Sequence, residues 1–445
     1  MRRLNRGTLA RLPADVRRPD YDFPHVGVGI VHLGMGAFHR AHQAVFTEDA
    51  LRGDGGDWGI LGVSLRQAAA SEALAAQDQL YTVETLAEGV DYRVVAAIRA
   101  SLCAPAHRGQ LEDALASPQT HIVTLTVTEK GYCLGADGRL DLTRPEISHD
   151  LEHPREPISA IGWIAHGLAA RAALDRRPMT VISCDNLREN GARLRDAVTA
   201  FTERSRPDLL PWLKDGVAFP RTVVDCIVPA ATGSTRSRVA EALGLDDTAC
   251  VQREAFSQWV IENRFAGPWP AWDRVGVQIV DDVDAYGRLK LHVLNACHSA
   301  LACLGLPRGY TFVREAIADA ELAGFLDGLV SIEIAPALEP LPVLDYWRTV
   351  RTRFANPRID YRLSQIAEDG PLKLAERIFP LMIANAATGA PVRSLARIVR
   401  GWLESEYGEM RVQGALDDPA LFPQPIRENA SLRAAVLEAV ARRGG

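Results

Sequence analysis

One segment near the N-terminus constrains the fold more than any other, because it joins an apolar strand to a helical pattern through a glycine turn. It reads GVGIVHLGMGAFHRAHQAVFTEDAL, with the strand over Gly29–Leu33. A nucleotide-binding β-α unit begins in this way. Gly34 and Gly36 stand where a dinucleotide fingerprint has its first two glycines, which allow a tight turn and the approach of a pyrophosphate. The third glycine is replaced by His39, so the turn alone could also be an ordinary connection.

The residues after this turn and after the next strand bear on which nucleotide could bind. Ala37 and Phe38 begin the predicted helix, and we expect them beside the cofactor. The next strand ends in GVSLRQ, which carries Ser64 and Arg66 but no acid. An acid at this place would bind the adenosine ribose of NAD, whereas an arginine suits the 2′-phosphate of NADP. The sequence therefore leaves NAD and NADP open, and Arg66 could equally be a solvated residue at a strand end.

The pattern of the whole chain predicts two domains of different class. Apolar, β-rich runs alternate with helical runs through the first part of the chain, which predicts a mostly parallel, doubly wound sheet. These runs include residues 57–65, 91–100, 121–129 and 179–183. From about Lys290 onward only long helical segments follow, among them residues 313–335, 371–387, 392–407 and 428–443. We expect an α/β protein with a Rossmann-type dinucleotide-binding domain over residues 1–282 and a mainly α-helical substrate and catalytic domain over residues 283–445.

Composition narrows the class of partner and the compartment. The 50 basic and 56 acidic residues give a net charge of −6 without a basic block, so neither nucleic acid nor an anionic membrane surface is indicated. The seven cysteines include no CxxC pair, which favours a reducing cytoplasm over a disulfide framework. We expect no membrane helix and no targeting leader. His39 and His42 lie three residues apart with no third ligand evident, so a metal site is not expected.

Three polar residues interrupt the apolar run LKLHVLNACHSALA, namely Lys290, Asn295 and His298. In an α-helix they would lie around one cleft, since about 100° per residue places Asn295 about 140° and His298 about 80° from Lys290. A lysine among apolar neighbours has its charged form disfavoured and can act as a base. An asparagine can donate to a developing alkoxide, and a histidine can orient a hydroxyl. The alternative is a lysine that reaches solvent and a satisfied core histidine.

Six segments, taken together, resemble motifs of the mannitol dehydrogenase family, the polyol-specific long-chain dehydrogenases. They are HLGMGAFHRAHQ, TLTVTEKGY, SCDNLRENG, FPRTVVDCIVP, FSQWVIENRF and KLHVLNACHSALA, in the family's order, with a looser match over residues 353–374. The resemblance implies a Rossmann-type domain followed by a helical domain. It also implies interconversion of a secondary alcohol and a ketone on open-chain polyols, ketoses or their acids, with NAD or NADP and without a metal.

The same resemblance implies a role for individual residues. Lys290 would be the general base, which takes the hydroxyl proton in oxidation and returns it in reduction. Asn295 and Asn186 would form the oxyanion site that stabilises the alkoxide. His298 would bind the substrate near Lys290, and Asp225 would lie close to the nicotinamide ribose.

One position departs from the mannitol 2-dehydrogenase branch, and several others are open candidates. Gly287 stands where that branch has a glutamate similar to a proton gate, which weakens an assignment to mannitol itself. Asp369, Lys373, Arg353 and Asn356 could bind distal hydroxyls or a carboxylate, although an exposed loop charge is the simpler interpretation of each one.

The sequence thus predicts a zinc-independent oxidoreductase that acts on an open-chain polyol, with mannitol and fructose as the first expectation. A fructuronate or tagaturonate reductase of the same family is the alternative, and it would need a cation for the substrate carboxylate. A nucleotide-binding protein without catalytic activity is a more remote alternative. The sequence does not choose between a monomer and a homodimer.

Overall fold

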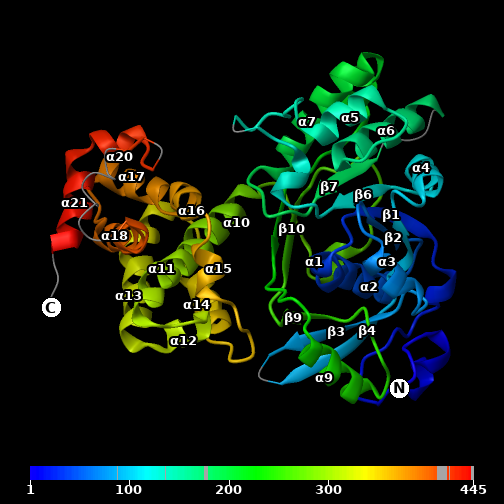
Figure 1. The fold of residues 1–445 in the computed structure, drawn as a ribbon, viewed down its shortest axis with the longest axis horizontal. Helices are drawn as coiled ribbons and strands as arrows, with labels where there is room; N and C mark the ends of the chain where they lie inside the picture. Colours follow the sequence, from blue (N-terminus) through cyan, green and yellow to red (C-terminus); the bar gives the residue numbers. More distant parts are fainter. Residues whose placement is uncertain (88, 136, 175–178, 408–417, 420, 442–445) are drawn as a thin grey trace. The chain divides into compact units, whose positions relative to one another are not determined.

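The computed structural model describes residues 1–87, 89–135, 137–174, 179–407, 418–419 and 421–441. The chain divides into two compact units, Met1–Val283 and Asp284–Gly445 (Figure 1). Each unit has its own hydrophobic core.

The centre of the first unit is a five-stranded parallel sheet in the order β5-β2-β1-β6-β7. Its strands are β1 Val28–Leu33, β2 Gly59–Ser64, β5 Ile98–Cys103, β6 Ile122–Leu125 and β7 Thr180–Ser183. The chain starts in the middle of the sheet, builds outward through β2 to β5, and then returns to the other side of β1 through β6 to β7. This order is that of a Rossmann-type fold, so the predicted mostly parallel, doubly wound sheet is confirmed.

Helices cover both faces of this sheet because its strands are apolar on both sides. Ile30 of β1 and Ile60 of β2 pack with the helices of one face, whereas Val31 and Val63 pack with those of the other. The first face carries α1 Ala37–Ala41, α2 Gln43–Asp54 and α3 Ala69–Ala75 (Figure 1). The second carries α4 Arg108–Ala116, α5 Pro145–Glu152, α6 Ala160–Ala173, α7 Asn190–Ser205 and α8 Leu210–Gly216.

Two smaller sheets complete the first unit. One has the order β4-β3-β9, from β3 Tyr81–Leu86, β4 Val90–Val95 and β9 Val251–Glu254. The other has the order β11-β10-β8, from β8 Thr222–Asp225, β10 Gln258–Glu262 and β11 Gln278–Val280. Helix α9 spans Gly233–Leu243, and short 3-10 turns are η1 Arg6–Arg11, η2 Phe23–His25, η3 Glu129–Tyr132, η4 Pro207–Leu209 and η5 Trp272–Val275.

The run at residues 91–100, expected as one strand, is divided between two sheets. Its first part belongs to β4, which pairs antiparallel with β3, and its last part belongs to β5 of the parallel sheet. The break falls at Ala96, whose N–H donates to the carboxylate of Glu48 at 2.9 Å. A backbone donor bound by a side chain leaves the strand ladder at that residue, so the two strands separate there.

The second unit is built from helices around α11, as the sequence predicted. Its elements are α10 Asp284–Leu289, the π-helical segment η6 Lys290–Asn295, α11 Ala296–Gly305, η7 Leu306–Arg308, α12 Val313–Ala318, α13 Ala320–Gly328, a second π-helical segment η8 Leu329–Ile334, η9 Pro336–Leu338, α14 Val343–Phe354, α15 Leu363–Ala367, α16 Gly370–Arg377, α17 Phe379–Thr388, α18 Arg393–Tyr407, α20 Gln424–Glu428 and α21 Ala430–Ala441.

One expectation for this unit needs correction. The helical run at residues 313–335 is interrupted because the Asp319 carboxylate accepts from the N–H groups of Glu321 and Leu322 and so begins a new helix. The continuous helical run Asp284–Arg308 is long and apolar enough to cross a membrane by length and composition only. Its apolar window is 61% buried inside the protein, as in a core helix.

Candidate active site

The glycine turn lies where the direction of strand order reverses, between β1 and β6. Gly34 follows β1 with φ of +92°, and a side chain there would place its Cβ 2.1 Å from the Thr126 carbonyl oxygen. Only glycine fits so close a contact. In open α/β sheets, ligands bind at the carboxyl ends of the strands at such a reversal.

At Gly36 the same turn has free space beside its backbone. The Gly36 N–H donates to the Gly34 carbonyl oxygen at 2.7 Å, which tightens the turn. A Cβ at Gly36 would meet only that oxygen, 3.8 Å away, so the space over the backbone is unoccupied by protein. Ala37 and Phe38 follow as the first residues of α1, both half-buried. These four residues fit the approach of a cofactor pyrophosphate.

Three histidines beneath the turn are part of the core. His32 and His39 stack with ring centroids 3.4 Å apart, and His32 contacts the hydroxyls of Thr124 and Thr126 at 2.7 and 3.0 Å. Burial lowers the pKa of His32 to about 3, and it lowers the pKa of His39 as well. The Nε2 of His42 lies 2.9 Å from the Gln258 carbonyl oxygen. In the part of the chain that the structure describes, no group of three or more His, Cys, Asp or Glu side chains could hold a metal ion.

Arg66 lies just beyond the end of β2, where the adenosine ribose of a dinucleotide is expected. Its Nη2 is 3.2 Å from an Oε1 of Glu146, in the first turn of α5. The arginine side chain is 77% exposed and the glutamate 34%. The sequence showed no acid at this strand end, but the fold brings one there from 80 residues further along the chain.

Asn186 follows a carboxylate that organises the ends of β6 and β7. Asp185 is 9% exposed, and it accepts hydrogen bonds from the N–H groups of Val127 (3.0 Å) and Thr128 (2.9 Å) and from the Tyr132 hydroxyl (2.8 Å). Burial raises the pKa of Asp185, although these donors act in the opposite direction. Asp185 was missed in the sequence, where the visible signal was an acid directly after an apolar strand.

Asp225 lies on a strand that begins beside the end of β7, where the Thr222 hydroxyl donates to the Ser183 carbonyl oxygen at 2.6 Å. It is the last residue of β8, pairs with Gln258 of β10, and is 5% exposed. The structure therefore places it in one of the small sheets, on a strand that starts beside the carboxyl end of β7. Asn186 itself is exposed at the end of β7.

Lys290 and Asn295 are the first and last residues of the π-helical segment η6 in the second unit. The expected α-helical winding is thus wrong for these residues. A π-helix joins residues five apart, as in the bond from Ala296 N–H to the Leu291 carbonyl oxygen. Residues 290 and 295 then lie about one turn from each other, closer to one face than the α-helical angle implies. Both side chains are half-buried.

His298 lies in α11, the continuation of the same helical run. Its side chain is buried, and its ring stacks on Phe354 with centroids 4.2 Å apart and meets Tyr361 edge-on at 5.3 Å. Both aromatic residues come from the segment RFANPRIDY, which resembled the family only loosely. Gly287 precedes Lys290 in α10.

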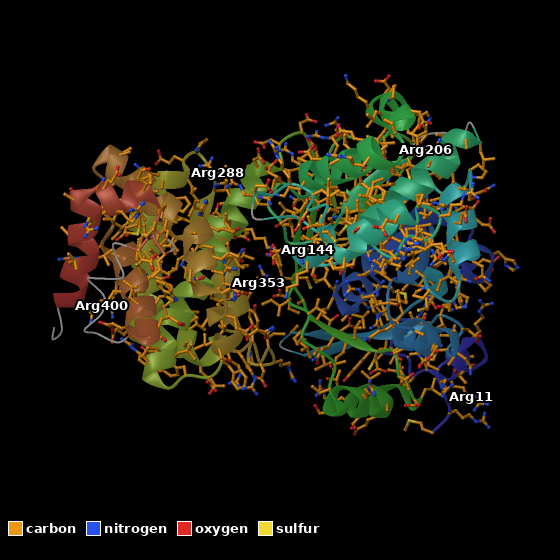
Figure 2. All side chains as sticks on the ribbon, turned by 45° about the horizontal axis from the view of Figure 1, so that its top comes forward. Arg11, Arg144, Arg206, Arg288, Arg353 and Arg400 are labelled. Atoms are coloured by element: carbon orange, nitrogen blue, oxygen red, sulfur yellow. The ribbon has the colours of Figure 1, made fainter. Side chains whose placement is uncertain are left out.

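The remaining candidates of the second unit form two local pairs, since the Asn356 N–H donates to the Arg353 carbonyl oxygen and the Lys373 N–H to that of Asp369. Arg353, on α14, is 7% exposed (Figure 2). Asn356 accepts from the Arg358 N–H through its side chain, and Asp369 precedes α16 in a left-handed conformation. Lys373 donates to the Ile366 carbonyl oxygen at 3.1 Å.

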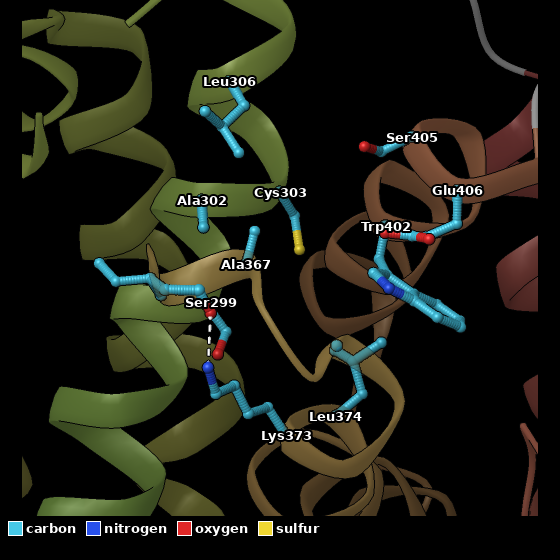
Figure 3. A pocket seen from close by; sticks show the side chains of 12 residues that line it. Ser299, Ala302, Cys303, Leu306, Ala367, Lys373, Leu374, Trp402, Ser405 and Glu406 are labelled. Atoms are coloured by element: carbon cyan, nitrogen blue, oxygen red, sulfur yellow. Dashed lines mark hydrogen bonds between the residues drawn. The ribbon is translucent and has the colours of Figure 1, made fainter. Parts of the chain in front are cut away.

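A small cavity in the second unit adjoins Lys373. It lies between α11, α16 and α18, and Ser299, Cys303 and Trp402 also line it (Figure 3). Its volume of about 30 Å³ accommodates a water molecule or two and is far too small for a sugar. This cavity is therefore not a substrate site.

Family models match nearly the whole chain. The mannitol dehydrogenase Rossmann domain matches residues 28–274, and the mannitol dehydrogenase C-terminal domain matches residues 282–441.

Three proteins are similar to this chain over most of their length. D-mannonate oxidoreductase of Escherichia coli strain K12 is 40% identical over 417 residues, which cover 91% of this chain and 86% of the relative. Mannitol 2-dehydrogenase of Cereibacter sphaeroides is 39% identical over 400 residues, which cover 88% and 84%. The structure of Pseudomonas fluorescens mannitol 2-dehydrogenase, a ternary complex with NAD and D-mannitol, is 33% identical with a TM-score of 0.86, covering 99% of this chain and 96% of that one.

Proposed function

Because the chain belongs to the mannitol dehydrogenase family and is an oxidoreductase of that family, we propose that it interconverts a secondary alcohol of an open-chain polyol or sugar acid and the corresponding ketone. The observation that carries this proposal is the π-helical segment, which brings a lysine and an asparagine about one turn apart. A base and a neutral hydrogen-bond donor are what the reaction requires at the carbinol oxygen.

The glycine turn supports a dinucleotide as the cofactor. Gly34 is required by the close contact with Thr126, and Gly36 leaves its backbone open to a phosphate. Ala37 and Phe38 would lie beside the bound group at the helix start. Asp225 is proposed for the nicotinamide ribose. When bound, the nicotinamide cofactor accepts or supplies the hydride.

Lys290 is the proposed general base. In oxidation its neutral amine removes the hydroxyl proton, and in reduction its ammonium returns a proton to the carbonyl oxygen. The Asn295 amide donates to the same oxygen and stabilises its negative charge, and Asn186 is proposed for the same role. With these groups, no metal ion is needed to polarise the carbonyl.

His298 is the proposed substrate ligand. The stacked ring of Phe354 and the edge contact with Tyr361 hold the imidazole in one orientation. A ring held in this way can hydrogen-bond to a substrate hydroxyl without first being ordered, which lowers the entropic cost of binding.

NAD is the proposed main cofactor. The carboxylate of Glu146 pairs with Arg66 at the end of β2, so the arginine charge is balanced there. The Glu146 carboxylate would repel the negatively charged 2′-phosphate of NADP, whereas a ribose hydroxyl of NAD could donate a hydrogen bond to this carboxylate. The solved relative with NAD agrees with this choice.

Mannitol and fructose are the first substrate pair to test, because relatives named mannitol 2-dehydrogenase are 36% and 39% identical to this chain. A sugar acid is the second candidate, and the similarity to D-mannonate oxidoreductase favours it. Arg353 is the cation proposed for a carboxylate substrate, because Lys373 donates to the Ile366 carbonyl oxygen and lines a cavity too small for a sugar. Mannitol, sorbitol, arabinitol and mannonate, each with NAD and NADP, form the decisive panel.

Lys290→Met tests the proposed base, and Lys214→Met, on an exposed position of α8, is its matched control. We expect kcat to fall by about 10³-fold or more in the first variant and to stay unchanged in the second. Turnover that survives Lys290→Met would show that another group is the base. A protein that is inactive with every substrate and cofactor, although folded and able to bind NADH, would contradict the proposed reaction.

The setting that we propose is the cytoplasm. All seven cysteines are free, which suits a reducing compartment. The proposed partners are small molecules alone, namely the nucleotide and the polyol or sugar acid.

A further inference from the structure

The π-helical segment that carries Lys290 is tied to a neighbouring helix at two places. The Nη1 of Arg377, at the end of α16, donates to the Asn295 carbonyl oxygen (3.4 Å) and to the Ser299 hydroxyl (3.0 Å). In the other direction, the His292 Nδ1 donates to the Arg377 carbonyl oxygen at 3.2 Å. One residue thus holds the middle and the end of the π-helical segment.

The second π-helical segment of this unit is held in a similar way. Asn385 on α17 donates from its buried side chain to the Glu333 carbonyl oxygen at 2.9 Å. The Glu333 carboxylate in turn accepts from the N–H groups of Ser394 and Leu395 at the start of α18. In both segments a side chain from another helix binds a carbonyl group of the π-helical backbone, so packing between helices favours this winding.

We propose that Arg377 is a positioning residue for the reaction, which acts by holding the π winding that brings Lys290 and Asn295 about one turn apart. This inference rests on the proposed function, because it concerns the same base and the same oxyanion donor. If the segment relaxed to α-helical winding, Asn295 would lie about 140° around the axis from Lys290. The two side chains could then no longer hydrogen-bond to the same substrate oxygen.

The proposed role differs from that of a merely stabilising arginine. Arg377 needs no contact with the substrate, since its contribution passes through the Asn295 carbonyl group and the Ser299 hydroxyl. A small displacement of the base relative to the oxyanion donor lowers the rate of the chemical step while cofactor binding in the first unit is unaffected.

The test compares Arg377→Gln and Arg377→Lys with the control Arg397→Gln. Arg397 is on α18, where it pairs with Glu321 at 3.2 Å and lies over the Phe325 ring. For each variant we would measure kcat, the KM for NADH, the pH profile of kcat, and amide hydrogen exchange over residues 289–299. The substrate is the ketone that corresponds to the alcohol identified by the activity panel, and the assay follows its reduction by NADH.

We expect kcat of Arg377→Gln to fall by about 10- to 100-fold, with the KM for NADH changed by less than about 2-fold. The basic limb of its pH profile should shift, and exchange over residues 289–299 should become faster. Lysine should restore part of the rate, because one donor remains. Arg397→Gln should behave as the wild type.

Two results would overturn the proposal. One is a kcat within about 2-fold of the wild type in Arg377→Gln. The other is faster exchange with an unchanged rate and pH profile, which would make Arg377 structural only. Failure of the proposed function itself is distinguishable, because the wild-type protein would then be inactive before any substitution.

Discussion

Glu48 of α2 is a buried carboxylate whose titration should control the stability of the first unit. Its side chain is 2% exposed, and its Oε2 accepts from the Tyr21 hydroxyl and the Ala96 N–H, both at 2.9 Å. Burial raises the pKa of Glu48 from 4.5 to about 7, although the bond from Ala96 and the charge of Arg93 act against the rise. The folded protein therefore keeps a proton on this group at pH values where the unfolded chain has lost it.

The sign of the effect follows from this difference. Between pH 4.5 and about 7 the folded state binds more protons than the unfolded state at Glu48, so the free energy of unfolding decreases as the pH rises. At about 1.4 kcal/mol per pH unit, the full contribution is about 3 kcal/mol. It is present below pH 4.5 and is lost by about pH 7.

Glu48→Gln isolates this contribution, because the amide stays neutral at every pH. Urea unfolding at pH 5 and pH 8 should show that the glutamine variant gains stability relative to the wild type by about 2 to 3 kcal/mol between the two pH values. Glu72→Gln, at an exposed position of α3, is the control and should show no such gain. Parallel stability curves for Glu48→Gln and the wild type would refute the reasoning.

Two further predictions concern the cofactor. Gly34→Ala should cost about 3 kcal/mol or more in unfolding free energy, because of its positive φ and the clash with a carbonyl oxygen. Gly36→Ala should leave the Tm nearly unchanged, but it should weaken NADH binding by about ten-fold because its Cβ enters the open space beside the turn. A fluorescence titration measures this affinity. An equal loss of Tm in the two glycine variants would contradict the prediction. Glu146→Gln should raise the kcat/KM measured with NADP, relative to that measured with NAD, by about ten-fold. Arg66→Ala should lower the same ratio. A ratio that neither variant changes would contradict the proposed role of this ion pair.

The parallel sheet could be predicted because its strands are continuous apolar runs next to helices. The small sheets could not, and β3 shows why. Thr82 and Glu84 of this strand are fully buried, so its polar residues do not mark a solvent face. Glu84 is compensated by Arg238 at 2.7 Å, a partner 154 residues away. The alternation of apolar and polar residues over residues 81–84 would predict a strand with one solvent face, whereas both faces of this strand are buried.

The residues of the candidate site also fall into two groups, those that the sequence made visible and those whose contacts depend on the fold. The glycine turn and the three polar residues of LKLHVLNACHSALA were visible because each interrupts a local pattern. Asp185 showed only that it is an acid directly after an apolar strand, and Glu146 showed no signal, because the contacts of both residues come from other elements. Glu146 meets Arg66 only through the fold, across 80 residues of sequence.

Lys290 shows that the sequence can suggest a candidate residue without giving its geometry. The hydropathy of residues 290–295 fits an α-helix, and the angle from Lys290 to Asn295 was derived on that basis. The π winding depends instead on Arg377, which is 82 residues from Asn295 and belongs to another helix. The relative placement of the proposed base and oxyanion donor is therefore a property of the packing of the second unit. Substitutions in α16 should alter it without changing any residue of the motif itself.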